Sequence, residues 1–277
     1  MSATVTSSPT AARALRPSIA LVGYGEVGQT LAADLQAAGM AAIAAWDRLF
    51  TDPASLPSRA LAAGHVAAGT GMAEAVRGRA LVVSAVTAGE CLAAAREAAP
   101  SLAPGAWYFD LNSVAPETKI AAARTIEAAG GRYVEAAVMS PIAPKRIASP
   151  MLLGGPHAQA FLPVAAALGF AGARPYADTF GRASAAKMCR SVMIKGMEAL
   201  LTESLLAARR YGVEETVLAS LHDLFPVGDW RGLARYMVSR SLQHGRRRAE
   251  EMREVARMVE DAGVDAWMSA ACAERQD

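Results

Sequence analysis

Cysteine and metal-binding patterns are what this sequence most lacks. Its 277 residues include three cysteines, an odd number at distant positions, which favours reduced thiols in a cytoplasm over a disulfide framework. The four histidines are dispersed, and neither a CxxC nor an HxxxH pair occurs. A zinc site needs closely spaced ligands, so the sequence predicts no metal. We therefore expect a cytoplasmic protein that binds no metal.

Charge of one sign and long apolar runs are also missing. The 28 basic residues are nearly balanced by 26 acidic ones, and this balance argues against nucleic acid as a partner. The longest uncharged stretch, residues 147–173, is interrupted by proline and glycine and is too broken to cross a membrane as one helix. With 53% hydrophobic side chains, however, the chain can bury enough surface to fold, and its length suits two domains.

What the sequence does contain is an alternation of short apolar runs with alanine-rich periodic stretches. From residue 18 to about residue 176 this pattern is typical of strands and crossover helices. After about residue 180 it stops, and the segment 184–211, which has no proline, predicts a long helix. We therefore predict an α/β protein with a Rossmann-type, mostly parallel sheet domain followed by an all-α C-terminal domain. The expected strands are 18–22, 41–46, 80–85, 106–111, 132–138 and 151–153.

These patterns divide the chain into three parts. Residues 1–17 are rich in Ser, Thr, Ala and Pro and contain no acid, which favours a disordered tail, although a transit peptide has a similar composition. We assign residues 18–180 to the sheet domain and residues 181–277 to the helical domain. Helix breaks within the helical domain are expected at Gly212, 226–228, Gly245 and Gly263.

A glycine-rich loop follows the first expected strand. The motif GxGxxG at residues 23–28 stands between that strand and an apolar-periodic helix. In such a loop the first glycine permits a tight turn, the second lets the backbone approach a pyrophosphate, and the third lets the helix pack against the strand. A glycine turn without a ligand is the alternative, but the strand and helix on either side favour a dinucleotide. The cofactor-binding residues predicted here are Gly23, Tyr24, Gly25, Glu26, Val27 and Gly28.

Further cofactor contacts are expected at the ends of two other strands. Asp47 stands 19 residues after Gly28, at the end of the second strand, where a carboxylate can bind the ribose hydroxyls. Asp47 would repel a 2′-phosphate and therefore favours NAD over NADP, whereas the adjacent Arg48 offers such a phosphate a partner. Val86 and Thr87, after the strand at 80–85, are expected to line the ribose side of the site.

Three further segments follow the glycine loop in a characteristic order. They read DLNSVAP at 110–116, VEAAVMSP at 134–141 and GRASAAKMCRS at 181–191. Together the four segments resemble the β-hydroxyacid dehydrogenase family, which includes the 3-hydroxyisobutyrate and 6-phosphogluconate dehydrogenases. The sequence departs from the family where a Ser-Pro pair replaces two glycines at 140–141 and where an Arg-Ser pair replaces two asparagines at 190–191. These departures resemble a divergent, phosphogluconate dehydrogenase-like branch.

The resemblance implies an oxidoreductase that transfers a hydride between NAD(P) and a small anionic substrate, a 2- or 3-hydroxy acid, with or without decarboxylation. It implies that Lys187 is the general acid/base, which takes the hydroxyl proton as the hydride passes to nicotinamide. Ser191 lies one turn further on the same helix face and is expected to replace the hydrogen bond of the family's asparagine. The substrate-binding residues that we expect are Asn112, Ser113, Met139, Ser140, Lys195 and Glu251.

Several of these residues have a second interpretation. Asn112 and Ser113 are also placed to cap the helix that begins at residue 116. Lys195 is placed either to hold a substrate carboxylate or to pair with Glu198. Glu251 stands where the family has an acid, but the lysine that the family places beside it is absent, so neighbouring arginines would have to supply the positive charge. Packing and solubility are the alternative role for Glu251.

Two other functions are compatible with the same motifs. An imine reductase has a similar architecture, although a lysine at position 187 argues against it, and a non-catalytic NAD(P) sensor would use the same glycine loop. The helical domain is small for the apolar surface of its long helix, so we expect a second copy to cover that surface and form a homodimer.

Overall fold

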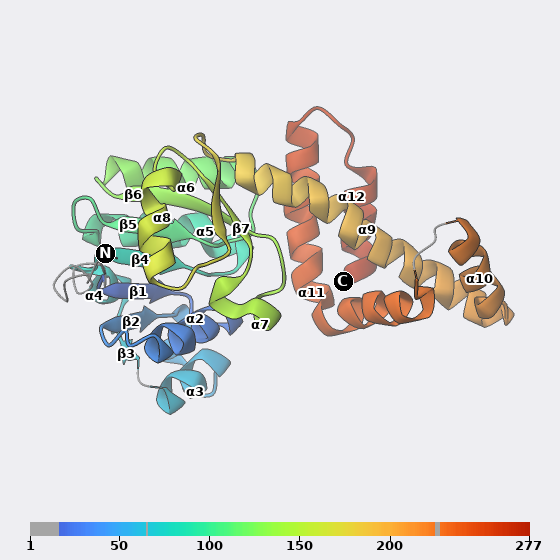
Figure 1. Ribbon diagram of the computed structural model, residues 1–277, viewed down its shortest axis with the longest axis horizontal. Coiled ribbons are helices and arrows are strands. Elements are labelled where there is room, and N and C mark those ends of the chain that lie inside the picture. The colour runs from blue at the N-terminus through green and yellow to red at the C-terminus, as the bar shows by residue number, and fades with distance from the viewer. Residues whose placement is uncertain (1–16, 65, 225–227) are drawn as a thin grey trace, which may run out of the picture. The chain divides into compact units, whose positions relative to one another are not determined.

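A computed structural model describes residues 17–64, 66–224 and 228–277 of the chain, which divides into two units (Figure 1). The first unit ends at Ala185 and the second begins at Ala186, five residues after the boundary predicted from the sequence. Of the tail predicted at 1–17, only residue 17 is among the described residues.

The first unit is built on one eight-stranded sheet. Its strand order is β3-β2-β1-β4-β5-β6-β7-β8. Neighbouring strands run parallel from β3 to β6, β7 is antiparallel to β6, and β8 is parallel to β7. The predicted Rossmann-type, mostly parallel sheet is therefore confirmed. The strands are β1 (Ile19–Val22), β2 (Ile43–Trp46), β3 (Ala67–Ala68), β4 (Leu81–Ser84), β5 (Trp107–Asp110), β6 (Arg132–Val138), β7 (Met151–Gly154) and β8 (Ala173–Ala177).

The two edge strands are absent from the sequence prediction. β3 consists of two exposed alanines, and β8 reads ARPYA with its three central residues exposed. A strand at the edge of a sheet is only partly covered, so it need not carry the apolar run that marks a central strand of a parallel sheet. Pro175 suits an edge because it cannot donate a ladder hydrogen bond.

Each face of the sheet has its own hydrophobic core, because successive side chains of a strand point to opposite faces. In β1, Ile19 and Leu21 belong to one core, whereas Ala20 and Val22 belong to the other. Figure 1 shows helices on both faces. The first core includes side chains of α2 (Glu26–Ala37) and α8 (Ala158–Ala167), and the second includes side chains of α4 (Met72–Val76), α5 (Cys91–Ala98) and α6 (Pro116–Ala128).

Short helices occupy several connections of this unit. Two of them follow β2 and β4 directly and therefore lie at the same edge of the sheet as the glycine loop, since β1, β2 and β4 are parallel. These two are η1 (Arg48–Thr51) and η2 (Ala88–Glu90), and the others are α3 (Leu56–Ala63), η3 (Ala99–Ser101), α7 (Ile142–Lys145) and η4 (Arg146–Ala148).

Helices make up the regular structure of the second unit: α9 (Arg182–Tyr211), which begins in the first unit, α10 (Glu214–Leu224), α11 (Trp230–Asp261) and α12 (Trp267–Gln276). The long helix predicted at 184–211 is α9. Gly212 and Gly263, with φ of +69° and +75°, follow the ends of α9 and α11 as predicted. The break predicted at Gly245 is instead a kink within α11 at His244 (φ −134°, ψ 17°). Residues 226 and 227 of the remaining predicted break lie outside the described residues.

A small apolar core lies within this unit. It joins one end of α9 to α10 and to the first turns of α11. Its buried members are Leu201, Leu205, Leu218, Trp230, Ala234 and Met237. Over the described ranges, none of the helices combines the length and the apolar character needed to cross a membrane.

Candidate functional site

The glycine loop that follows β1 contains three glycines. Packing requires a glycine at two of these positions and not at the third. Gly23 has φ +92°, and a Cβ there would lie 2.3 Å from the Ala85 carbonyl oxygen. A Cβ on Gly28 would lie 2.1 Å from the Gly23 carbonyl oxygen. A Cβ on Gly25, by contrast, would meet no described atom within 4 Å. The space above Gly25 is therefore open to a ligand that approaches the backbone.

The start of α2 provides hydrogen-bond donors beside this open space. Gly25 is its N-cap, and no side chain of the described residues caps the helix there. The first backbone N–H groups of a helix have no partner within the helix, and the helix dipole favours an anion near them. A pyrophosphate fits these requirements, so Gly25, Glu26 and Val27 are the residues that would hold it.

Asp47 is fixed by backbone donors at the end of β2. Its Oδ2 accepts the Tyr24 N–H at 2.7 Å, and its Oδ1 accepts the Leu49 N–H at 2.9 Å. The carboxylate is thereby held against the glycine loop and retains lone pairs for ribose hydroxyls. The Tyr24 side chain is buried and packs edge-on against Phe50. Tyr24 therefore contributes its backbone to this region, and its ring contributes to the core.

Asn112 is used inside the first unit. Its Oδ1 accepts the Val86 N–H at 2.7 Å, and its Nδ2 donates to Ser84 Oγ at 3.0 Å. Because the side chain is buried and bonded on both sides, it fixes Val86, a predicted cofactor residue, and Thr87, which caps η2. The N-cap residue of α6 is Ala115 rather than Asn112 or Ser113, and the Asn112 side chain is bonded to Val86 and Ser84 instead.

A buried ion pair lies behind Asn112, and the sequence analysis missed it. Lys119 Nζ lies 2.8 Å from Asp110 Oδ1, and each side chain is 1% exposed. Asp110 also accepts the Asn112 N–H and the Tyr133 hydroxyl, at 2.8 and 2.5 Å. Burial and the Asp110 charge together raise the pKa of Tyr133 and of the Cys91 thiol, which keeps both groups protonated as donors. The available signal was a lysine among apolar positions of α6.

Glu135 is a second buried carboxylate that the sequence analysis missed. It lies in the middle of β6 and accepts the N–H groups of Gly181 and Ser184, each at 2.6 Å. It thereby caps the first turn of α9, the helix that carries Lys187. Burial raises the pKa of Glu135, and these hydrogen bonds, together with the charge of Lys119, only partly oppose the increase.

The predicted substrate loop after β6 is tied to the cofactor helix. Met139 donates its N–H to the Pro150 carbonyl at 2.8 Å, and the Ser140 hydroxyl is buried without a hydrogen-bond partner among the described residues. Further along, Arg146 Nε donates to Asp34 Oδ1 of α2 at 2.7 Å. Arg146 has φ +52°, a strained value for a residue other than glycine, and this ion pair helps to hold it.

In the second unit the structure brings Lys195 and Glu251 together. The buried Lys195 and the partly buried Glu251 form an ion pair between α9 and α11, and Arg247 lies 3.4 Å from the same carboxylate. Burial lowers the pKa of Lys195, and the Glu251 charge only partly opposes this. Burial also raises the pKa of Glu251, but Lys195, with smaller contributions from Arg247 and Lys187, brings it below its usual value.

The other partner considered for Lys195 is engaged elsewhere. Glu198 forms a buried ion pair with Arg248, so it does not pair with Lys195. Lys187 and Ser191 lie half-buried on α9, four residues apart, and Lys195 follows four residues later on the same side of the helix. Beside Glu251, the positive charge expected from a neighbouring arginine comes from Arg247.

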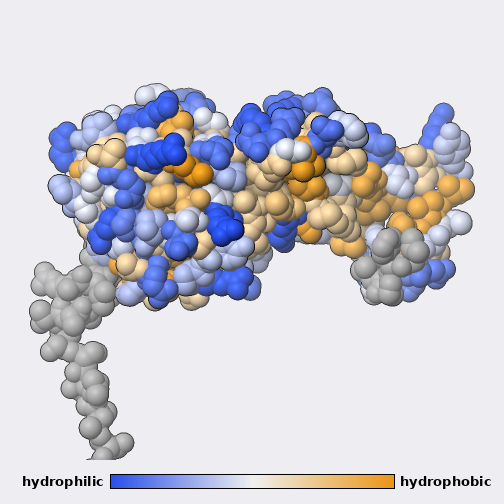
Figure 2. Space-filling view, turned by 90° about the horizontal axis from the view of Figure 1, so that it is seen from above, coloured by the Kyte–Doolittle hydropathy of each residue, from blue (hydrophilic) through white to orange (hydrophobic). Residues whose placement is uncertain are grey.

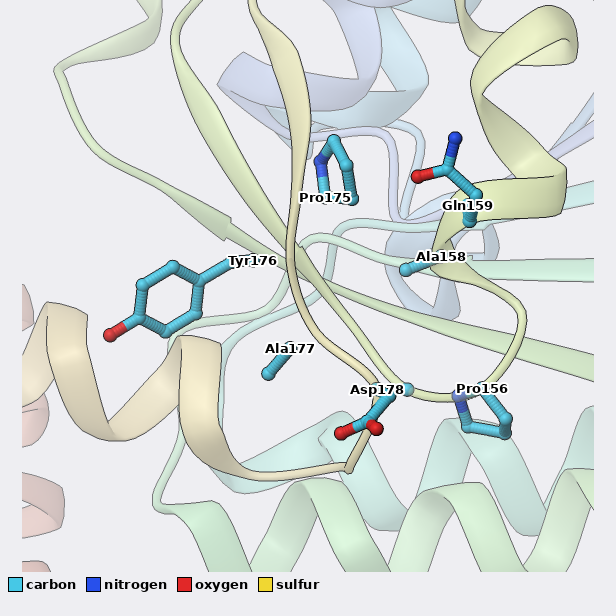
Figure 3. A pocket seen from close by; sticks show the side chains of 8 residues that line it. Pro156, Ala158, Gln159, Pro175, Tyr176, Ala177 and Asp178 are labelled. Carbon is cyan, nitrogen blue, oxygen red and sulfur yellow. The ribbon is translucent and has the colours of Figure 1, made fainter.

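A separate open cavity of about 270 Å³ lies in the first unit between β8 and the start of α8 (Figure 3). Its walls are 155–156, 158–159 and 175–178. None of the predicted site residues lines it. Among the described residues, no group of three or more His, Cys, Asp or Glu side chains is placed to hold a metal ion.

Comparison with known proteins identifies the family. A model of the NAD-binding domain of 6-phosphogluconate dehydrogenase matches residues 18–177. The chain belongs to that NAD-binding family. A domain of unknown function matches residues 208–277, from the last turn of α9 onward, so most of α9 lies between the two matched segments. No curated protein matches the chain.

Solved structures extend the likeness over nearly the whole chain. A conserved hypothetical protein from Sinorhizobium meliloti is 40% identical, with a TM-score of 0.74 over 94% of this chain and 87% of that one. The conserved protein MTH1747, described as structurally similar to 3-hydroxyacid dehydrogenases, is 32% identical, with a TM-score of 0.72 over 94% and 95%. The 3-hydroxyisobutyrate dehydrogenase of Mycobacterium tuberculosis shares the fold at 17% identity, with a TM-score of 0.72 over 93% and 91%. The predicted resemblance to hydroxyacid dehydrogenases is confirmed.

Proposed function

We propose that the protein is a cytoplasmic, NAD(P)-dependent dehydrogenase of a small, anionic hydroxy acid. The observation that carries the proposal is the open space above Gly25, bordered by the uncapped start of α2 and by the fixed carboxylate of Asp47. These features occur in a chain of the 6-phosphogluconate dehydrogenase NAD-binding family. They fit a pyrophosphate and a ribose diol at the expected spacing.

NAD is the favoured cofactor in this proposal. Asp47 accepts two backbone N–H groups, so its carboxylate cannot turn away from the ribose position. Hydroxyl groups donate to a carboxylate, whereas a 2′-phosphate is repelled by it. The bound nicotinamide would supply the hydride chemistry, and the chain would supply orientation and proton transfer.

Lys187 is the proposed general acid/base. As a neutral amine it would accept the substrate hydroxyl proton at Nζ during oxidation, and it would return that proton during reduction. Ser191, one turn along α9, would hold the substrate by a hydrogen bond. Ser113, Met139 and Ser140 are proposed substrate contacts; the buried Ser140 hydroxyl without a partner supports this role.

Two of the predicted substrate residues take modified roles in the proposal. Lys195 and Glu251 are paired with each other, so we assign the pair to supporting α9 near Lys187 rather than assigning Lys195 to bind a substrate carboxylate directly. Asn112 supports the site through Val86. Lys195 and Arg247 both lie against the single carboxylate of Glu251, and the resulting excess of positive charge in the second unit suits an anionic substrate.

Turnover and Lys187 variants test this function. Hydroxy acids of three to six carbons and their oxo forms are to be screened by NADH and NADPH absorbance. With the substrate found, Lys187→Ala is expected to lower kcat by about 10²- to 10⁴-fold with little change in NADH affinity. Lys187→Arg keeps the charge but cannot act as a base, so it should be equally impaired. Full turnover by either variant would remove the lysine mechanism, and NADH binding without turnover of any substrate would favour the sensor.

An imine reductase is the second candidate. The imine reductase from Myxococcus stipitatus, solved with NADP+, shares the fold at 16% identity, with a TM-score of 0.58 over 93% of this chain and 92% of that one. A panel of cyclic imines in the same absorbance assay separates the two candidates. Imine reduction without hydroxy acid oxidation would replace the dehydrogenase proposal.

A homodimer is part of the proposed function. Met193, Met197, Leu200 and Tyr211 are exposed on α9 and recur at a spacing that puts them on one face. Figure 2 shows hydrophobic surface on the helical unit. A contiguous apolar face of this kind is typical of a self-association surface.

Light scattering at micromolar concentration tests the dimer. The wild type is expected to have twice the chain mass, and Leu200→Asp is expected to have the chain mass. Leu206→Asp is the matched control, because Leu206 is an exposed leucine of α9 outside that face. A monomeric wild type, or a dimer that tolerates Leu200→Asp as well as Leu206→Asp, would contradict the proposed surface.

A further inference from the structure

An ion pair joins the two strands that flank the glycine loop. Arg48 begins η1 directly after β2, Glu90 ends η2 after β4, and β1 lies between these strands in the sheet. Arg48 Nη1 lies 2.7 Å from Glu90 Oε1. The pair therefore reaches across the carboxyl end of β1, where the chain turns into the glycine loop.

Arg48 is positioned to contribute to the choice of cofactor. It follows Asp47, whose carboxylate is fixed by the N–H groups of Tyr24 and Leu49. A guanidinium next to a ribose-binding carboxylate is placed to bind a 2′-phosphate, since arginine binds phosphate by two parallel hydrogen bonds. In this structure, however, its Nη1 donates to Glu90.

We infer that Glu90 is a specificity-determining residue that makes the protein select NAD over NADP. The inference rests on the proposed function, because it presumes that a dinucleotide binds at the glycine loop. Glu90 acts in two ways: it occupies the guanidinium of Arg48, and it adds a second carboxylate to the sheet edge at which Asp47 lies. A 2′-phosphate would meet two negative charges and a guanidinium that is already paired with one of them, whereas a 2′-hydroxyl would meet a hydrogen-bond acceptor.

This role can be separated from folding. The Arg48 and Glu90 side chains are 60% and 37% exposed, and an ion pair with that much solvent contact contributes little to stability. The backbone N–H of Glu90 bonds to the Thr87 carbonyl and does not depend on the side chain. Substituting the carboxylate should therefore leave the fold intact, which unfolding midpoints will verify.

Fluorescence titrations with NADH and with NADPH test the inference. Glu90→Gln is expected to lower the Kd for NADPH about tenfold and to change that for NADH less than about threefold. In Glu90→Gln with Arg48→Ala, the gain for NADPH should disappear, because it requires the released guanidinium. Glu97→Gln, which removes an exposed carboxylate elsewhere on α5, is the matched control and should leave both constants unchanged.

The outcomes separate this inference from the proposed function. If the wild type binds neither dinucleotide, the proposed function fails and the inference fails with it. If the wild type binds NADH but Glu90→Gln leaves the ratio of the two constants unchanged, or if the gain persists without Arg48, the inference alone is overturned. A wild type that prefers NADPH also overturns it while leaving a dinucleotide-binding protein.

Discussion

The two units hold their buried carboxylates in different ways. In the sheet unit, Asp110 and Glu135 accept hydrogen bonds from backbone N–H groups, Asp110 in addition to its ion pair with Lys119, and these bonds fix a loop and a helix start. In the helical unit, Glu251 and Glu198 are paired with side chains of lysine and arginine. A backbone donor cannot be exchanged by mutation, whereas a pair of side chains can be replaced together. We therefore expect the sheet unit to tolerate substitution of its buried carboxylates less well than the helical unit.

The two units also differ in how completely they bury their apolar side chains. Both faces of the sheet are covered by helices, and each contributes to a buried core. The helical unit has a small core and leaves large apolar side chains exposed on α9 and α12, among them Leu200, Tyr211 and Trp267. The sheet unit thus completes its own core, whereas the helical unit retains surface that a second copy can cover.

The largest effect is expected from breaking the ion pair of the sheet unit. Lys119→Met leaves the buried Asp110 carboxylate without its cation and should lower the free energy of unfolding by about 4 kcal/mol. Urea unfolding measures this loss. Lys145→Met, at an exposed position of α7, is the matched control and should change stability by less than about 0.5 kcal/mol. Equal stability of the two variants would contradict the importance of the pair.

Double substitutions then test the difference between the units. Lys195→Met should cost about 2 kcal/mol, less than Lys119→Met because Arg247 remains 3.4 Å from Glu251. Adding Glu251→Leu should recover most of that loss, since apolar side chains can replace a buried ion pair. Adding Asp110→Leu to Lys119→Met should recover nothing, because the Asn112 N–H loses its acceptor. If both double variants recover, the proposed difference is wrong.

The smallest effect is a difference in pH dependence. The pKa of Glu135 is raised, so its contribution to stability is full below the ordinary glutamate value of 4.5 and is lost as pH rises through the raised pKa. The pKa of Glu251 is lowered, so its contribution is present above 4.5 and is lost as pH falls through the lowered pKa.

Unfolding of Glu135→Gln and Glu251→Gln between about pH 3 and pH 7 should therefore show opposite trends, of about 1 kcal/mol each. The advantage of the wild type over Glu135→Gln should shrink as pH rises, and its advantage over Glu251→Gln should grow. Parallel trends would show that the two carboxylates are held alike.

Local sequence patterns predicted the central strands because these are short continuous apolar runs, and they predicted α9 because no proline interrupts that segment. The local sequence is enough to recognise the four consecutive buried residues of β1 and the glycines at 23 and 28. The edge strands were missed because two exposed alanines and the segment ARPYA do not form an apolar run. The break predicted at Gly245 is a kink at His244, and the glycine itself serves packing, because a Cβ there would lie 2.3 Å from the Gln276 carbonyl oxygen.

The site residues also divide into those that local sequence predicts and those that depend on distant partners. The sequence predicted Asp47 because its position after a strand is sufficient to suggest a ribose contact. The sequence could not show that Asn112 accepts a hydrogen bond from Val86, that Glu135 caps α9, or that Glu90 pairs with Arg48. Each of these bonds joins residues at least 26 positions apart, and no local spacing encodes them.

By itself, the sequence determined the α/β class, the glycine loop and the helix that carries Lys187. These follow from period, turn chemistry and composition, which act over a few residues. The tertiary structure alone decided which polar side chains are left for a ligand. That choice depends on which donors and acceptors folding brings within hydrogen-bond distance, and a buried polar group that finds a protein partner is no longer available to a substrate or a cofactor.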